Sequence, residues 1–502
     1  MKPHKTKTLI TYSIILGSIN LLGFPIYASA KALSESSKSK PRKEQEISKK
    51  ERQEREAKLL TITNANLKNE ANKKDSPGFT LGNMENIELT KNIRLGETGL
   101  EIKSDNGNFK LGIGGFEQGD SQVNFNADNT GLQDGIIPRR TRIRLDGFVF
   151  KNINYKIEYD FARVVGSPIA VGGITEAWLG YANFPLKPLT IKIGQIKEPL
   201  TLASSTSDRY LAFIERSLFL NAFVENPNPY KLGVSAESYG TRWSVRAALQ
   251  TQNTALGTAI LDNTAYQAVG RGTFLPYYNG LTQFLHIGVS GGRTWMRNVF
   301  NPTTGKLESA PLFFSSQPFA NVDRTPFANT GLLTTNLGPG HKALESYTRF
   351  GAELALVEGP FSFQTEYMQT ALAGVGYSGK DVLEGSYALI SYFLTGESRA
   401  YDNKSGAFTR VKPKHNFDLN GGWGAWEIAI RWDQLAMNTQ DVNGGNTQTA
   451  VIAFNWYLNR HLRLMADYGV VIHESARKTN PVIARFNGLN PSILEFRMQA
   501  DW

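Results

Sequence analysis

Apolar and polar residues alternate with a period of two through the chain from about residue 99 onward. Turns rich in Gly, Asn and Asp separate segments of roughly ten residues, the length a tilted strand needs to cross a membrane. After the first thirty residues, no stretch comes near the roughly 18 consecutive apolar residues of a membrane helix. If such a chain enters a membrane, it must form a closed β-barrel, because hydrocarbon offers no hydrogen-bond partner to an open sheet edge.

The end of the chain shows this pattern most clearly. The two faces of the predicted strand differ in polarity, since Leu494, Phe496, Met498, Ala500 and Trp502 alternate with Glu495, Arg497, Gln499 and Asp501. Several apolar faces end in Trp or Tyr, as expected for an aromatic girdle at the lipid interface. Outer-membrane barrels typically end on an aromatic residue, and Trp502 fits that rule.

The first thirty residues have the parts of a secretory signal peptide. Three lysines precede an apolar stretch over residues 9–26, and Ala28 and Ala30 supply the small side chains of a cleavage site. We therefore predict secretion through the inner membrane, with cleavage after Ala30. The alternative is an uncleaved transmembrane anchor, which the small residues and the polar flank argue against.

Residues 31–77 predict a charged helical or disordered extension ahead of a barrel over residues 78–502. Up to residue 77 the chain holds 16 Lys and Arg and 8 Asp and Glu, of 55 and 45 in all, so the remainder is nearly neutral. Anion selectivity would therefore depend on where charges are placed, not on net charge. The chain has no cysteine, which excludes a disulfide, a thiol nucleophile and a Cys-ligated metal.

The alternation predicts sixteen strands, and hence an all-β transmembrane antiparallel barrel. They start near residues 109, 139, 154, 175, 189, 231, 241, 265, 282, 347, 361, 386, 425, 448, 461 and 493. An even number of strands leaves both barrel ends of the chain in the periplasm, with long extracellular loops over residues 119–138, 198–229 and 299–346. Residues 397–423 are an exception, being long yet periplasmic. The barrel would enclose an aqueous lumen, into which loop 198–229 is expected to fold as a constriction.

A dense run of arginines opens the second predicted strand. Alternation places Arg140, Arg142 and Arg144 on one face, and an arginine facing lipid at the midplane costs roughly 2–4 kcal/mol. This face should therefore look into the lumen as a ladder of guanidinium groups. Arginine stays charged and matches phosphate oxygens with two hydrogen bonds, so the ladder would bind and pass anions.

Further cations are candidates for the pore lining. Alternation turns Lys192, Arg242 and Arg246 inward, and the constriction loop contributes Arg209 and Arg216. Asp208 and Glu215 stand beside the two loop arginines. The alternative for cations with acidic neighbours is a set of salt bridges that only stiffen the wall.

Three stretches resemble a known family. They are IPRR at residues 137–140, SSTSDRYLAFIER at 204–216, and LTGESR at 394–399 followed by GAFTRVKP at 406–413 and GWGAWE at 422–427. With them the chain resembles the phosphate-selective porin O and P family over about residues 95–502. The resemblance implies a sixteen-stranded homotrimer with an inward-folded third loop and an arginine ladder feeding a central anion site.

The same resemblance implies roles for individual residues. Arg139 and Arg140 match the family's paired arginines, and Arg209 stands where the characterised members have a loop lysine. Two departures are Arg209 itself, which lies beside Asp208, and Phe116, which stands where a basic residue is expected. Both departures argue against strict selectivity for orthophosphate, but neither argues against a channel.

Together these features predict an outer-membrane porin of a Gram-negative bacterium for passive diffusion of small anions, most of all phosphate or pyrophosphate. We expect contact with lipid, and no cofactor, metal, catalytic residue or nucleic acid. One alternative is a weakly selective general porin or structural outer-membrane protein. A remote one is a hydrolase, since residues 288–292 match G-x-S-x-G, but that motif needs a strand–turn–helix context.

Overall fold

The computed structural model describes residues 87–90, 92–128, 130–162, 173–184, 186–225, 228–251, 265–301, 306–309, 312–334, 342–477 and 479–502. The predicted signal peptide, residues 1–30, and the predicted extension, residues 31–77, lie outside these ranges. Residues 79–502 form one compact unit. In its described part, no helix is long and apolar enough to cross a membrane.

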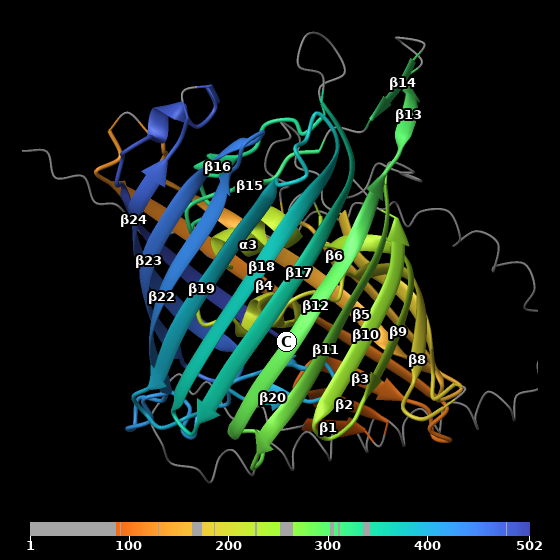
Figure 1. The fold of residues 1–502 in the computed structure, drawn as a ribbon. Coiled ribbons are helices and arrows are strands. Elements are labelled where there is room, and N and C mark those ends of the chain that lie inside the picture. The colour runs from red at the N-terminus through yellow and green to blue at the C-terminus, as the bar shows by residue number, and fades with distance from the viewer. Residues whose placement is uncertain are drawn as a thin grey trace, which may run out of the picture. The chain divides into compact units, whose positions relative to one another are not determined.

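Sixteen antiparallel strands close into a barrel (Figure 1). They are β4 (Phe109–Phe125), β5 (Gly135–Val149), β6 (Ile153–Asp160), β7 (Gly173–Ala182), β8 (Thr190–Lys197), β9 (Tyr230–Tyr239), β10 (Trp243–Thr251), β11 (Ala265–Tyr278), β12 (Gln283–Met296), β17 (Ala343–Glu358), β18 (Phe361–Val375), β19 (Val382–Phe393), β22 (Ala425–Asn438), β23 (Asn443–Tyr457), β24 (Leu462–Ser475) and β25 (Ser492–Asp501). Each pairs with the next, and β25 pairs back onto β4 from Ser492↔Phe125 to Asp501↔Phe116. The prediction of a sixteen-stranded barrel is confirmed.

Three short strands precede the barrel and were not predicted: β1 (Ile87–Thr90), β2 (Ile93–Gly96) and β3 (Gly99–Lys103). β3 pairs with β4 just beyond the place where β25 ends. At this seam Trp502 and Gly115 exchange both backbone hydrogen bonds, at 2.9 and 3.0 Å. A Cβ on Gly115 would lie 2.4 Å from the Arg142 carbonyl oxygen and 2.9 Å from the Trp502 ring, so only glycine fits there.

The outer face of the wall is apolar and the inner face polar, as the alternation predicts. On β22, Ile428, Ile430 and Trp432 are exposed on the outside, while Arg431 and Asp433 are buried inside. Exposed large apolar side chains recur on the other strands, including β5, β8 and β10. Such a band matches the hydrocarbon of a membrane and leaves the charged residues to the lumen.

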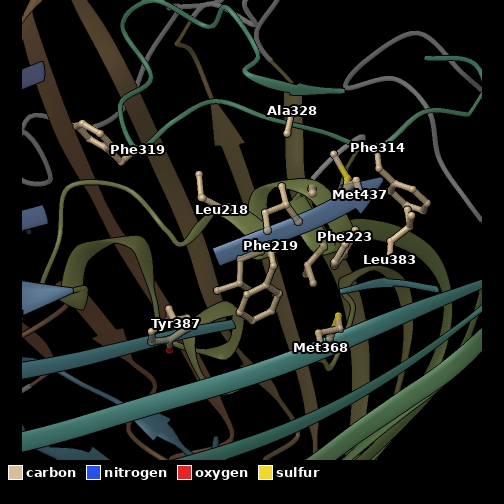
Figure 2. Packing of buried hydrophobic residues seen from close by; sticks show 14 of the residues in the cluster. Leu218, Phe219, Phe223, Phe314, Phe319, Ala328, Met368, Leu383, Tyr387 and Met437 are labelled. Atoms are coloured by element: carbon tan, nitrogen blue, oxygen red, sulfur yellow. The ribbon is translucent and has the colours of Figure 1, made fainter. Parts of the chain in front are cut away.

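Loop 198–229 lies between β8 and β9, as predicted, and folds into the lumen. It contains α2 (Leu202–Ser205), the 3₁₀ turn η1 (Asp208–Tyr210), α3 (Leu218–Leu220) and the π-helical turn η2 (Asn221–Glu225). Its apolar side chains are buried against the inner wall and the loop before β17 (Figure 2). The Phe219 ring stacks on Tyr387 of β19 at 6.0 Å, and the Phe223 ring meets Phe314 edge-on at 5.6 Å. We refer to residues 198–229 as the constriction loop.

Two further segments fold inward. Residues 312–334, from the long loop predicted over 299–346, bear β15 (Ser315–Ser316) and β16 (Ala328–Asn329) and bury Phe314 and Phe327. That long loop also carries the hairpin of β13 (Asn298–Asn301) and β14 (Lys306–Ser309). The first extracellular loop is shorter than the predicted 119–138, because the pairing of β4 with β5 continues as far as Gln122 and Gly135.

Residues 397–423, predicted as a long connection on the periplasmic side, form the third inward segment. It carries β20 (Tyr401–Asp402) and β21 (Ala407–Phe408), whose rings pack on Phe284 of β12. The Phe408 amide donates to Thr206 Oγ1 of the constriction loop at 3.3 Å. The segment is long because it enters the lumen and supports the constriction loop from the periplasmic side.

Candidate functional site

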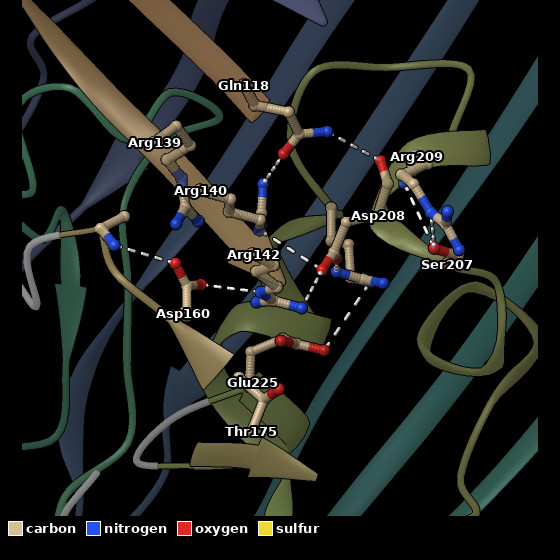
Figure 3. A network of polar contacts seen from close by, with 12 residues as sticks. Gln118, Arg139, Arg140, Arg142, Asp160, Thr175, Ser207, Asp208, Arg209 and Glu225 are labelled. Carbon is tan, nitrogen blue, oxygen red and sulfur yellow. Dashed lines mark hydrogen bonds and ion pairs between the residues drawn. The ribbon is translucent and has the colours of Figure 1, made fainter. Parts of the chain in front are cut away.

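A cavity of about 200 Å³ lies in the lumen, between β5, β6, the constriction loop and the segment 312–334. Its wall is strongly charged. The charged lining residues are Arg139, Arg140, Arg142, Arg216 and Arg324 against Asp160, Asp208, Glu215 and Glu225. Five guanidinium groups facing four carboxylates give the cavity a formal excess of one positive charge. Figure 3 shows most of these side chains converging between β5 and the loop.

Arg139 and Arg140 both point into this cavity, although they are neighbours in a strand. Strict alternation would turn one of them outward. The register between β4 and β5 shifts here, because Gln118 pairs with Arg140 but Gly119 pairs with Pro138. Arg139 is left without a partner on β4, and such a bulge redirects its side chain.

The cavity arginines of β5 are held by carboxylates. Arg139 donates to both carboxylate oxygens of Glu215, at 2.7 and 3.1 Å. Arg140 lies 3.3 Å from Asp208, and Arg142 donates to Asp160 at 2.7 Å and to Asp208 at 3.2 Å. Arg139, Arg140 and Arg142 therefore do not carry free guanidinium groups.

Asp208 and Glu215 connect the constriction loop to the wall. Asp208 also accepts from Arg216, which donates to the carbonyls of Ala203 and Thr206 and so braces the loop. Burial alone would raise the pKa of Asp208, but the neighbouring guanidinium groups outweigh it and hold the pKa well below its usual range. The pKa of Glu215 is lowered for the same reason, against the cost of its burial, by the arginines that contact it.

The lowered pKa values predict how loop docking depends on pH. A carboxyl whose pKa is depressed in the folded state stabilises that state above its ordinary pKa, here 4.5 for Glu215 and 3.8 for Asp208. That stabilisation is lost as pH falls below these values. We expect the change in single-channel conductance caused by protonation of these two carboxylates to lie below about pH 5. A step at neutral pH in planar bilayers that disappears in Glu215→Gln would contradict this assignment.

Arg324 differs from the other cavity arginines, and no feature of the sequence marked it as a site residue. It lies in the inward segment 312–334, half-buried. Among the described residues, no carboxylate forms an ion pair with it, and its Nε has no hydrogen-bond partner. Burial lowers the pKa of Arg324, and the positive charges of Arg139 and Arg140 lower it further. Arg324 is therefore a cavity cation that no carboxylate neutralises through an ion pair in the described part of the chain.

Three other predicted pore residues, Arg144, Arg209 and Arg216, differ in where they lie. Arg144 donates to Asp146 at 2.6 Å and to the Thr98 carbonyl at 2.9 Å, near β3. Arg209 lies 3.4 Å from Asp501, in a second, much smaller cavity. Arg216 lines the main cavity but is almost fully buried. Their part in anion binding remains a prediction.

Three cations on the β8–β10 side are also outside the main cavity. Lys192 pairs with Glu237 at 2.9 Å and lies over the Trp178 ring. Arg246 contacts the same Glu237 at 3.8 Å, and Arg242 is exposed one residue before β10. For Lys192 and Arg246, the geometry fits the salt-bridge alternative better than a binding site.

The sequence could not identify the residues that hold the loop. Arg497 of β25 donates to Asp120 at 2.7 and 2.6 Å and to Glu215 at 2.9 Å, fully inside the barrel. In the sequence it was one more polar residue of the last strand. The only local signal was the adjacent acid–base pairs at 208–209 and 215–216, which marked the loop as charged.

The G-x-S-x-G match at residues 288–292 lies inside β12, an unbroken strand over Gln283–Met296. Ser290 therefore does not stand on the strand–turn–helix corner that a hydrolase nucleophile requires. The nearby His286 is hydrogen-bonded to Tyr401 and Glu353, at 2.7 and 2.9 Å, and links the wall to the segment 397–423.

A sixteen-stranded barrel with an apolar outer band and a charged lumen, narrowed by an inward loop, defines an outer-membrane porin. A barrel of this size leaves room for solutes to diffuse through the protein. The chain belongs to the family described as phosphate-selective porin O and P, which matches residues 106–502. The resemblance seen in the sequence is thereby confirmed.

Two relatives are similar over most of this chain. Porin O of Pseudomonas aeruginosa is 26% identical over 386 residues, covering 74% of this chain and 84% of that protein. An uncharacterized protein of Caulobacter vibrioides is 27% identical over 354 residues, 69% of this chain and 64% of that protein.

Solved structures of outer-membrane proteins are similar at low identity. A loop-deletion mutant of OmpT from Vibrio cholerae has a TM-score of 0.46 and 10% identity, over 79% of this chain and 100% of that chain. An anion-selective porin from Comamonas acidovorans has a TM-score of 0.46 and 8% identity, over 78% of this chain and 100% of that chain.

Proposed function

We propose that this porin conducts small oxyanions, phosphate foremost, through the arginine-walled cavity beside the constriction loop. The observation that carries the proposal is the cavity's excess of guanidinium over carboxylate groups, with Arg324 left unpaired in the part of the chain that the structure describes. Arginine offers phosphate a planar pair of donors and keeps its charge at any physiological pH. The family name and that of porin O support the same interpretation.

The carboxylates in the wall have a function in this proposal. A cluster of five free arginines would bind a phosphate too tightly for it to leave, and conduction requires that each site release its ion. Pairing most arginines with Asp160, Asp208 and Glu215 reduces the attraction while keeping the cavity net positive. An anion would contact Arg324 first and then exchange among partly neutralised donors.

The same pairing favours a second candidate function, a weakly selective general porin. Four of the five cavity arginines have a carboxylate partner, so most of the cavity's positive charge is compensated. Discrimination between anions would then be modest, although cations would still be disfavoured.

Ion selectivity in planar bilayers tests both candidates. We expect the purified full-length protein to give an anion-selective reversal potential in a KCl gradient, and phosphate at low millimolar concentration or below to inhibit the chloride current. Anion selectivity without phosphate inhibition would support the general porin. A cation-selective reversal potential would contradict both.

Further aspects of the proposal concern maturation and assembly. We propose that the signal peptide is cleaved after Ala30, that the mature chain forms a homotrimer, and that the protein has no enzymatic activity, cofactor or metal. N-terminal sequencing of the outer-membrane protein tests the cleavage site. Native mass spectrometry in detergent tests the trimer.

A further inference from the structure

Buried polar atoms without partners gather on one side of the main cavity. Asn221 and Asn228 line it, are 7% and 4% exposed, and leave their Nδ2 groups without hydrogen-bond partners within the described ranges. Glu225, between them in sequence, has no hydrogen-bond partner for Oε1 there, and this oxygen forms only long ion pairs with Lys197 and Arg216, at 3.4 and 3.7 Å. Native proteins leave few buried polar groups unsatisfied, so such a group calls for an explanation.

These atoms are held in place by the fold. Asn228 uses its side-chain oxygen to accept from the Tyr230 amide at 2.9 Å, which leaves its own amide group without a partner in the described part of the chain. Asn221 and Glu225 begin and end the π-helical turn η2, whose apolar residues are buried in the lumen core. The two unbonded amide groups therefore belong to side chains that the fold positions, beside a carboxylate oxygen that has room for a further hydrogen bond.

From this arrangement we infer that the cavity binds a phosphate monoester of a small polyol, not only bare inorganic phosphate. The inference rests on the proposed function, because it uses the same cavity. The phosphate would lie against Arg324, and hydroxyl groups would lie against Asn221, Asn228 and Glu225. A hydroxyl both accepts and donates, so it can accept from an asparagine amide while donating to the glutamate oxygen.

Charge argues against a second phosphoryl group at this subsite. A diphosphate would place additional negative charge beside Glu225, with Asp208 and Asp160 lining the same cavity. A neutral hydroxylated group meets no such repulsion. There is also room for it, since a water molecule needs only about 10–15 Å³ of such volume and the cavity measures about 200 Å³.

The first test compares ligands on the unaltered channel and needs no variant. Chloride current through the full-length protein in planar bilayers is titrated with inorganic phosphate, pyrophosphate and glycerol 3-phosphate. We expect glycerol 3-phosphate to half-inhibit the current at a concentration about fivefold or more below that of inorganic phosphate, as one or two additional net hydrogen bonds would give. Equal inhibition by phosphate and its glycerol ester, or stronger inhibition by pyrophosphate, would overturn the inference.

A variant then assigns the effect to the subsite. Asn221→Ala removes one free donor and is expected to reduce the advantage of glycerol 3-phosphate to about twofold or less, with inhibition by inorganic phosphate unchanged. Asn480→Ala is the control, because Asn480 is a buried asparagine at the extracellular end, bonded to the Asn329 and Asn443 carbonyls and outside the cavity. An undiminished advantage in Asn221→Ala would overturn the assignment.

The outcomes also separate this inference from the proposed function. If all three ligands fail to inhibit and the channel prefers cations, the proposed function itself fails. If inorganic phosphate inhibits but its ester gains nothing, only the polyol subsite is rejected.

Discussion

Replacing Arg324 with glutamine is expected to raise the phosphate concentration that half-inhibits the chloride current by about tenfold or more. A hydrogen bond to a charged group contributes roughly 1.5–3 kcal/mol, and about 1.4 kcal/mol corresponds to one factor of ten. Arg324 has no carboxylate partner in the described part of the chain, so its removal leaves no buried charge uncompensated there. We therefore expect the variant to fold and to insert with its constriction loop in place, and to conduct less chloride, because the cavity loses its excess of positive charge. Planar-bilayer titration with phosphate measures all of these effects.

A matched control is Arg477→Gln. Arg477 is exposed at the extracellular end, where it donates to the Thr439 carbonyl at 2.9 Å and to Asn443 at 2.6 Å. The substitution removes the same charge from the chain without touching the cavity, so phosphate inhibition should stay as in the wild type. If Arg324→Gln and Arg477→Gln behave alike, Arg324 does not bind the anion.

Substitutions of the β5 arginines would test anion binding less directly. Arg140→Glu would be expected from the sequence to weaken or reverse anion selectivity. In the structure, a glutamate there would stand beside Asp208 and Glu215 and remove a guanidinium group that holds both. Any change in selectivity would then be mixed with displacement of the constriction loop.

The sequence predicted the barrel because the alternation is a local property. Each strand must present an apolar face to lipid and a polar face to water, and a period of two records this in consecutive residues. The limits of the constriction loop followed from the two strands beside it. β1–β3 were missed because strands of four or five residues are too short to show a clear alternation. The inward course of residues 397–423 was missed because it depends on contacts with distant residues such as Phe284.

The candidate site could be predicted only in part, because alternation is a local property and the site is built from distant segments. Alternation turned Arg140, Arg142 and Arg144 inward, but it could not say which carboxylates would meet them. Asp160 is brought to Arg142 by the register of β5 against β6. Glu215 is brought to Arg139 by the path of the constriction loop. A single bulge also redirected Arg139. Pairing across strands and loops is a tertiary property that periodicity does not record.

Glu215→Ala is expected to release the constriction loop. Glu215 is 2% exposed and contacts Arg139 at 2.7 Å, Arg497 at 2.9 Å and Arg140 at 3.6 Å. Breaking a buried ion pair by removing one partner typically costs about 3–5 kcal/mol, because the other charge stays buried and uncompensated. The barrel should survive, since its backbone pairing does not involve this side chain. We expect higher single-channel conductance and new proteolytic cleavage within residues 198–229.

Glu384→Ala serves as the control, because Glu384 is an exposed wall residue whose carboxylate accepts from Tyr367 at 2.8 Å. Unchanged conductance and a protected loop in Glu215→Ala would show that the carboxylate does not hold the constriction. The two main variants should differ in kind. Arg324→Gln loses phosphate affinity and chloride conductance while its loop stays protected from protease. Glu215→Ala gains conductance and keeps anion selectivity, because the excess of positive charge in the cavity rises. If Arg324→Gln also exposed the loop to protease, or if Glu215→Ala lost conductance, anion binding and loop anchoring would not be separate tasks of unpaired and paired arginines.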